Sequence, residues 1–254
     1  MVKRLTMKIA RLVLAVLGAP SGPALADQTH VAVAANFTDA ANEIAAAFRA
    51  ETEHEAILSF GATGQLYTQI TQDAPFEVFL SADAERPAKA LAEGFGVDGS
   101  NFTYAVGRIA LWSASADLVT GEETLRNGRF DKIALADPAT APYGIAAVEA
   151  LTTLGLPAAL EPKIVQGKNI AQTFQFIETG NAELGFVALS QIAATDRGSR
   201  WEVPADLYSP IRQDAILLKK GEANAAAAAF LDFLKGPVAT AIIEKYGYGT
   251  ESGN

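Results

Sequence analysis

The sequence contains no cysteine and only two histidines, His30 and His54. The absence of cysteine excludes disulfides, thiolate metal sites and cysteine nucleophiles. The serine-hydrolase elbow, the zinc-protease helix motif and the glycine-rich dinucleotide fingerprint are also missing. His54 stands between two glutamates at the end of an expected helix and is interpreted as a solvated turn residue. We therefore expect a protein that is not an enzyme and carries no cofactor.

Positive charge is also scarce, because 20 lysines and arginines face 29 aspartates and glutamates, for a net charge of −9. Nucleic acids and anionic membrane surfaces recruit basic patches, so neither is an expected partner. If an acidic chain of this kind binds an anion, it must do so with neutral dipoles.

Long apolar runs are missing too, apart from a short one near the N-terminus. Four basic residues within the first 11 precede the apolar run 12–17, and Ala24-Leu25-Ala26 forms a small-x-small site. This pattern predicts a secretory signal peptide over residues 1–26, cleaved near Ala26. The run is too short to span a bilayer, and no cysteine follows the site to carry a lipid. We expect export to a periplasm-like compartment as a free, monomeric protein.

Strand-like and helix-like segments alternate along the rest of the chain, which predicts an α/β fold with mainly parallel sheets. The expected strands are 30–34, 56–60, 76–81, 109–112, 132–136, 163–166, 184–188 and 215–219. The expected helices are 39–51, 65–71, 84–93, 124–127, 144–154, 170–178, 223–234 and 238–246. We expect two lobes, one of residues 27–104 plus 209–254 and one of residues 105–208, with a hinge where the chain crosses between them.

Four strand-to-helix junctions share a small, uncharged character, and each contributes one residue of interest. These residues are Asn36, Thr63, Tyr143 and Ile170. The carboxyl ends of parallel strands lie at one edge of a sheet, where ligands bind. The first N–H groups of each helix lack an intrahelical partner and, with the helix dipole, favour an anion. The pattern predicts a site of neutral donors for a fully ionised tetrahedral oxyanion.

Each of these residues also has a simpler interpretation. Asn36 and Thr63 are typical helix N-caps or turn residues, Tyr143 suits a packed loop, and Ile170 suits an ordinary helix start. Asp83 and Asp137 each end a strand-like run and form a second, weaker candidate, a carboxylate pair for hydrolysis of phosphate esters. The joint pattern of four junctions favours the anion site.

The chain resembles the periplasmic molybdate-binding components of ABC importers, within the type II periplasmic binding protein fold. The resemblance covers nearly all of residues 28–248. It is carried by residues 33–40, 59–66, 74–83, 136–138, 142–144, 184–190, 234–237 and 246–248.

The resemblance implies a molybdate or tungstate ion held between the lobes and delivered to a membrane permease. By position, Asn36 and Thr63 correspond to side-chain donors, Tyr143 to a phenol or alanine position, and Ile170 to a backbone N–H donor. One departure is Ala188, which stands where some members have a tyrosine ligand, so we expect Tyr143 to supply the phenol.

Two alternatives remain beside this expectation. A receptor of the same fold for sulfate, ferric iron or an amino acid comes second. An amino-acid receptor needs an arginine and an aspartate for the two ends of its ligand, yet no arginine stands at a junction and Arg108 lies near the expected hinge. A secreted phosphate-ester hydrolase comes third.

Overall fold

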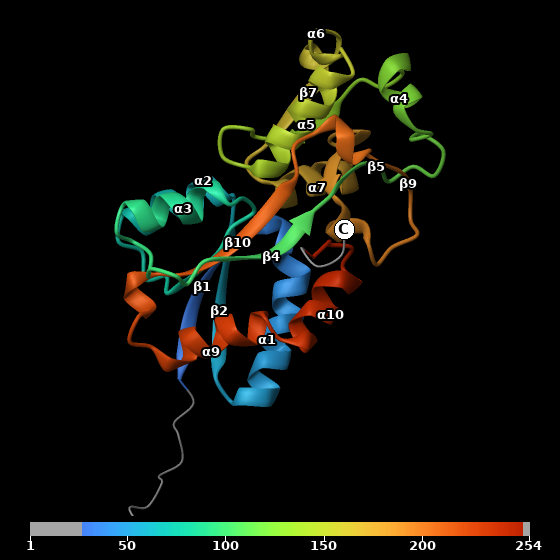
Figure 1. The fold of residues 1–254 in the computed structure, drawn as a ribbon. Helices are drawn as coiled ribbons and strands as arrows, with labels where there is room; N and C mark the ends of the chain where they lie inside the picture. Colours follow the sequence, from blue (N-terminus) through green and yellow to red (C-terminus); the bar gives the residue numbers. More distant parts are fainter. Residues whose placement is uncertain (1–26, 251–254) are drawn as a thin grey trace, which may run out of the picture.

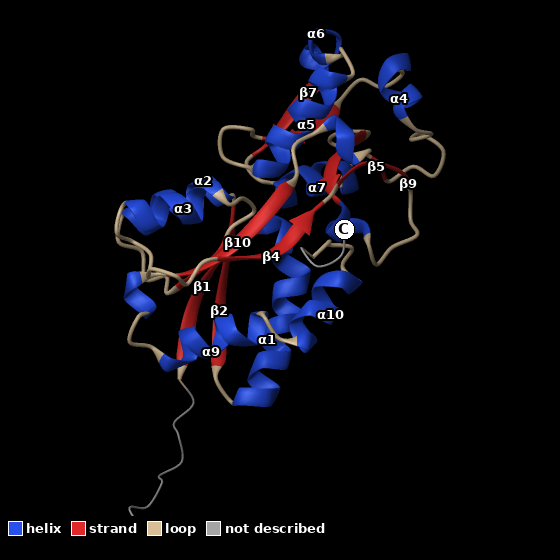
Figure 2. Cartoon of the chain, viewed as in Figure 1, coloured by secondary structure: helices blue, strands red, loops and turns tan. Residues whose placement is uncertain are grey.

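The computed structural model describes residues 27–250, so the expected signal peptide lies outside the described residues. Two five-stranded sheets form the centres of two lobes (Figures 1 and 2). The α/β class is confirmed, although each sheet is mixed, with two parallel and two antiparallel strand pairs.

The first sheet has the strand order β2-β1-β3-β10-β4. Its strands are β1 (Gln28–Ala34), β2 (Glu55–Gly61), β3 (Val78–Leu80), β4 (Phe102–Gly107) and β10 (Ile211–Leu217). The helices around it are α1 (Thr38–Thr52), α2 (Thr63–Thr71), α3 (Glu85–Ala92), α9 (Ala225–Leu234) and α10 (Pro237–Lys245), with the 3-10 turns η1 (Ala35–Phe37) and η4 (Lys219–Gly221).

Helices cover both faces of this sheet. Successive residues of its strands point to opposite faces and are therefore buried alternately on one side and the other. Val31 and Val33 pack with α1, α9 and α10 on one face, whereas Ala32 packs with α2 and α3 on the other. Figure 1 shows this two-sided cover, with the orange and red C-terminal helices beside the blue α1. A strand buried on both faces reads as a continuous apolar run, as Val31 to Ala34 does.

The second sheet has the order β7-β6-β8-β5-β9. Its strands are β5 (Ile109–Ser113), β6 (Ile133–Ala136), β7 (Ile164–Gly167), β8 (Leu184–Ala188) and β9 (Ser199–Glu202). Around it lie α4 (Glu122–Asn127), α5 (Pro142–Thr153), α6 (Pro157–Leu160), α7 (Ile170–Glu178) and α8 (Leu189–Ile192), with η2 (Glu161–Lys163) and η3 (Ala205–Leu207). Leu111 faces the cluster under α5, and its neighbours Ala110 and Trp112 face the cluster under α7 and α8.

The chain crosses between the sheets at Arg108, which separates β4 from β5, and again between β9 and β10. β4 continues to Gly107, three residues past the expected lobe boundary at residue 104. β10 begins at Ile211, and the C-terminal helices return to the first sheet. Exposed Arg108 pairs with Glu202 at 2.8 Å, so this arginine joins the two crossings and does not face a ligand site.

The last described residues form a further link to the first crossing. The backbone of Gly249 exchanges two hydrogen bonds with Val106 of β4, at 2.7 and 2.9 Å. Within residues 27–250, no single helix is long and apolar enough to cross a membrane; α9 and α10 meet that test of length and composition only as a pair bent by 59°.

Candidate functional site

The register of the parallel strands brings the four predicted junctions together in pairs. Ala34 at the end of β1 pairs with Gly61 at the end of β2, and Ala136 at the end of β6 pairs with Gly167 at the end of β7. The helical segments that follow, η1, α2, α5 and α7, therefore start at the carboxyl ends of the parallel strands. The two sets of strand ends face one another, since residues from all four helix starts line one cavity. This is the arrangement that the alternation of strands and helices predicts.

A small cavity of about 10 Å³ lies where these helix starts meet. It is lined by Ala34, Ala35, Asn36, Gly61, Ala62, Thr63, Ala82, Ala141, Pro142, Tyr143, Asn169 and Ile170. All four candidates from the sequence are in this lining. Among these described lining residues, Tyr143 alone has an ionisable side chain, so the wall carries no formal charge at neutral pH.

The helix starts at the cavity leave backbone N–H groups for a ligand. No side chain caps the first turn of η1, α2 or α5, and small residues, Ala34, Ala62 and Ala141, hold the three N-cap positions. In α7 the Asn169 side chain accepts from Gln172 N at 2.9 Å. This bond satisfies the backbone N–H of the third helical residue and leaves that of the first, Ile170, for a ligand. Orphan N–H groups at several helix starts, together with the helix dipoles, make an anion site.

The hydroxyl of Thr63 is buried in the cavity wall, and the residue is only 1% exposed. Its oxygen accepts a hydrogen bond from Ala82 N at 3.1 Å, which fixes the side chain against the loop after β3. Accepting this bond leaves the hydroxyl proton, and a hydroxyl can donate while it accepts. Thr63 is therefore suited to donate to a ligand.

Asn36 lines the cavity, but its side chain serves the protein interior. Its Nδ2 lies 2.8 Å from Gln213 Oε1, 3.0 Å from Tyr248 Oη and 3.4 Å from Tyr143 Oη. A side-chain amide has two N–H bonds, and the two shorter contacts use both. The expectation of a side-chain donor at this junction needs revision, because the group at Asn36 that remains for a ligand is its backbone N–H.

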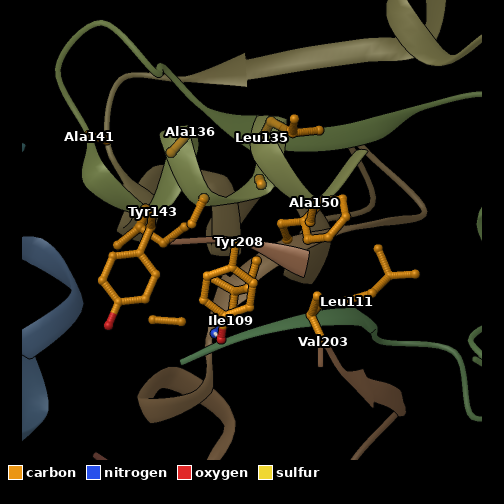
Figure 3. Close-up of a cluster of buried hydrophobic side chains, with 14 of the residues drawn as sticks. Ile109, Leu111, Leu135, Ala136, Ala141, Tyr143, Ala150, Val203 and Tyr208 are labelled. Atoms are coloured by element: carbon orange, nitrogen blue, oxygen red, sulfur yellow. Dashed lines mark hydrogen bonds between the residues drawn. The ribbon is translucent and has the colours of Figure 1, made fainter. Parts of the chain in front are cut away.

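Tyr143 stands at the end of the buried apolar cluster of the second lobe. Figure 3 shows its ring at one edge of that cluster, with the hydroxyl directed away from the other side chains. Burial raises the pKa of Tyr143 well above its usual value, and Tyr248 and Tyr104 raise it further. The phenol is therefore a neutral donor at physiological pH. Ala188 is absent from the described lining, whereas Tyr143 is part of it.

Behind the cavity lies a network of buried polar side chains that the junction pattern does not predict. Its members come from four separate segments: Tyr104, Ser190, Gln213 and Tyr248. Tyr248 Oη donates to the Asn36 carbonyl at 2.7 Å, and Ser190 Oγ donates to the same oxygen at 2.9 Å. Local patterns carry no signal for such contacts, because up to 212 positions separate the partners. Gln213 lies between Arg212 and Asp214 in the polar first half of β10, so the sequence does not indicate that its side chain is buried.

Uncharged hydrogen bonds join the lobes around the cavity. Gly64 N in the first turn of α2 donates to the Thr140 carbonyl of the second lobe at 2.9 Å. A β-carbon on Gly64 would lie 3.2 Å from Thr140 Cα, so glycine allows this close approach. Ser190 Oγ of the second lobe reaches Asn36 of the first.

The carboxylates considered for catalysis are engaged separately. Asp83 pairs with Arg86 and accepts from Ser81 Oγ at 3.1 Å. Asp137 accepts from Ala139 N at 3.0 Å and from Gln166 Nε2 at 3.2 Å, as turn aspartates do. Within residues 27–250, no group of three or more His, Cys, Asp or Glu side chains could hold a metal ion.

Known proteins resemble this chain over nearly all of its described residues. The bacterial extracellular solute-binding protein family matches residues 29–249. The molybdate-binding protein ModA of Rhodobacter capsulatus is 53% identical over 246 residues, which cover 97% of this chain and 98% of that protein. The protein of the same name from Azotobacter vinelandii is 50% identical over 252 residues, covering 97% and 100%.

A solved structure agrees with these relatives. The structure titled Azotobacter vinelandii periplasmic molybdate-binding protein matches with a TM-score of 0.85 and 39% identity, covering 87% of this chain and 99% of that one. These likenesses confirm the two-lobed type II binding-protein fold and a binding, non-enzymatic class. The chain is a member of the bacterial extracellular solute-binding protein family.

Proposed function

We propose that this protein captures molybdate, and also tungstate, in the cavity between its lobes and delivers the ion to the permease of an ABC importer. The observation that carries the proposal is the meeting of four helix starts at a cavity whose described lining has no charged side chain. Relatives at 53% and 50% identity, both named molybdate-binding proteins, support the choice of ion.

The chemistry of the cavity suits a fully ionised tetrahedral oxyanion. Such an ion offers acceptors only, and the cavity offers N–H and O–H donors. Several oriented helix dipoles stabilise the anion without a formal positive charge, so an overall acidic protein can still bind it. The nearby guanidinium of Arg86 is neutralised by Asp83 and adds little net charge. Ferric iron fits poorly, because it prefers several anionic oxygen ligands.

The proposed donors are spread over both lobes. Thr63 gives its hydroxyl and Asn36 its backbone N–H from the first lobe, whereas Tyr143 gives its phenol and Ile170 its backbone N–H from the second. A ligand held from both sides favours the closed arrangement of the lobes, which is how binding couples to lobe closure. All of the proposed donors belong to the protein, so the proposal includes no cofactor.

The proposed setting is the periplasm. Residues 1–26 would act as a cleaved signal peptide, and the remaining chain would diffuse as a monomer between its ligand and the permease. The description of the family as extracellular and of the Azotobacter vinelandii protein as periplasmic supports this setting.

The test is isothermal titration of residues 27–254 with molybdate, tungstate, sulfate and phosphate in separate runs. We expect tight one-to-one binding of molybdate and tungstate and far weaker heats from sulfate and phosphate. If a well-folded protein binds neither molybdate nor tungstate, the proposal is wrong.

A further inference from the structure

Gln213 is a fully buried amide in the middle of β10, beside the candidate cavity but outside its lining. The pairing of β10 with β4 shifts register between Gln213 and Asp214, which marks a β-bulge. Bulges often redirect a side chain next to a functional site. A buried amide without partners is costly, so its contacts show what it does.

Three hydrogen bonds fix which end of the Gln213 amide faces the cavity residues. Its Oε1 receives Asn36 Nδ2 at 2.8 Å and Tyr104 Oη at 3.1 Å. Because Asn36 Nδ2 can only donate, the amide oxygen must lie on its side. Tyr104 Oη also lies 3.0 Å from the Ser81 carbonyl, so its single proton is shared between two oxygens. Nε2 then faces Tyr143 and donates to Tyr143 Oη at 3.0 Å.

The backbone is shaped to allow this contact. A β-carbon on Gly107 would lie 2.2 Å from Tyr143 Oη and 2.7 Å from Gln213 Nε2. Real β-carbons do not approach so closely, so only glycine at the end of β4 leaves room for the two side chains to meet. Glycine at such a place marks a close approach of other groups.

The contact decides the direction of one proton. A phenol oxygen that accepts from Gln213 Nε2 must point its own proton away from that amide. The neighbouring Tyr248 hydroxyl already receives Asn36 Nδ2 at 3.0 Å and donates to the Asn36 carbonyl. Two acceptors then remain for the Tyr143 proton, the Tyr248 oxygen, which is within hydrogen-bond reach, and an oxyanion in the cavity that Tyr143 lines. The oxyanion is the stronger acceptor because it carries a full negative charge.

We propose that Gln213 is a positioning residue that makes Tyr143 a donor toward the bound oxyanion. The inference rests on the proposed function and adds a basis for selectivity between fully ionised and protonated oxyanions at the Tyr143 hydroxyl. A fully ionised oxyanion accepts a hydrogen bond from the Tyr143 hydroxyl. If the ligand oxygen at this position carries a proton, two donors face one another and this hydrogen bond is lost. Gln213 thus favours molybdate over hydrogen phosphate without touching either.

The test compares Gln213→Met in the natural chain and in a Tyr143→Phe background, with molybdate as the titrant. Methionine keeps the volume of glutamine and removes its donor. We expect Gln213→Met to weaken molybdate binding about tenfold when Tyr143 is present, as the loss of one oriented hydrogen bond does. In the Tyr143→Phe background we expect no further loss, because the phenol through which Gln213 acts is gone. Gln175→Met, on the exposed face of α7, is the control and should bind as the natural chain does.

Equal loss in both backgrounds, or no loss in either, would overturn the inference. If the natural chain itself binds no molybdate, the proposed function fails first, so the two failures are distinguishable. Thermal melting of each variant checks that it is folded.

Should the methionine variant fail to fold, Gln213→Glu carries the test through its pH profile. Its carboxylate would accept the Tyr143 proton and turn the phenol oxygen toward the ligand. We expect weak molybdate binding at about pH 9 and recovery toward about pH 6 as the carboxyl group becomes protonated, with a flat profile for the natural chain. A loss of binding that does not change with pH would contradict the positioning role.

Discussion

At the scale of single residues, Thr63 combines burial with an unused proton. The residue is 1% exposed, and its oxygen accepts from Ala82 N at 3.1 Å. The side chain is therefore held in one orientation before any ligand arrives. Such preorganisation spares the ordering cost that binding would otherwise include.

Thr63→Val tests this hydroxyl, because valine keeps the branched shape and removes the oxygen. We expect molybdate affinity to fall at least about tenfold, since a hydrogen bond to a charged group contributes roughly 1.5–3 kcal/mol. We also expect a loss of about 1–3 kcal/mol in the free energy of unfolding, because Ala82 N loses its acceptor. Calorimetric titration and urea denaturation measure the two effects.

Thr63→Ser is the matched control, since it keeps the hydroxyl and should retain most of the affinity. Unchanged binding by the valine variant would show that the hydroxyl donates to nothing in the complex.

The candidate site can be located from the sequence, but the hydrogen bonds that each of its residues makes cannot be predicted from it. The junction pattern identifies Asn36 and Tyr143 because it depends on strand ends and helix starts, which are local features. It does not show that Gln213 and Tyr248 occupy the Asn36 amide, because those contacts join residues 177 and 212 positions apart. Distant polar contacts of this kind form only when the whole fold does.

At the scale of elements, the start of α7 offers a backbone donor that can be removed cleanly. Asn169, the N-cap, is fully extended with φ −156° and ψ 174°, the conformation that proline requires in the residue before it. Ile170 is the first helical position, where proline is well tolerated because its missing N–H has no intrahelical acceptor. Proline at this position removes the backbone N–H and keeps the helix intact.

Ile170→Pro should therefore weaken molybdate binding by roughly 10- to 100-fold through loss of one charge-assisted hydrogen bond. Ile170 is 3% exposed, so the variant also loses packing. Ile170→Ala loses the packing and keeps the N–H, and it should bind more tightly than the proline variant at comparable stability. Equal affinities for the two variants would mean that this N–H does not contact the ligand; titration calorimetry beside thermal melts decides the matter.

The elements differ in how well the sequence predicts them, and the reason is the burial of their faces. α7 and β8 have the expected bounds, since the apolar positions of α7 recur at helical spacing and β8 is buried along its whole length. β9 is not among the expected strands, because it is a polar edge strand with partly or fully exposed side chains. β4 is not among them either, since its six residues mix buried and partly buried positions without a regular alternation.

At the scale of the whole molecule, three hydrogen bonds around the cavity join the lobes through neutral groups. The bonds Gly64–Thr140, Asn36–Ser190 and Gln213–Tyr143 involve no formal charge. Closure held by such contacts is little affected by salt, because screening acts on charges. Among these bonded groups, the one that can ionise is a phenol.

Buried phenols predict a loss of stability at alkaline pH. Burial raises the pKa of Tyr104, Tyr143 and Tyr248 above the usual value of 10.0. Above pH 10 the unfolded chain releases these protons while the folded chain keeps them, so unfolding becomes more favourable as pH rises. The stability from the neutral phenols is fully present below pH 10 and is lost as the pH rises toward their folded pKa values. Each such tyrosine contributes a slope of about 1.4 kcal/mol per pH unit.

Tyr143→Phe isolates one of these groups from the lysines that titrate in the same range. In urea denaturation at a series of pH values above 10, we expect the slope for this variant to be shallower than that of the natural chain by about 1.4 kcal/mol per pH unit. Below pH 9 the two curves should run parallel, since the phenol stays protonated in both the folded and the unfolded state. Identical slopes above pH 10 would mean that Tyr143 ionises as easily in the folded protein as in the unfolded chain, and burial would then not raise the pKa of its hydroxyl.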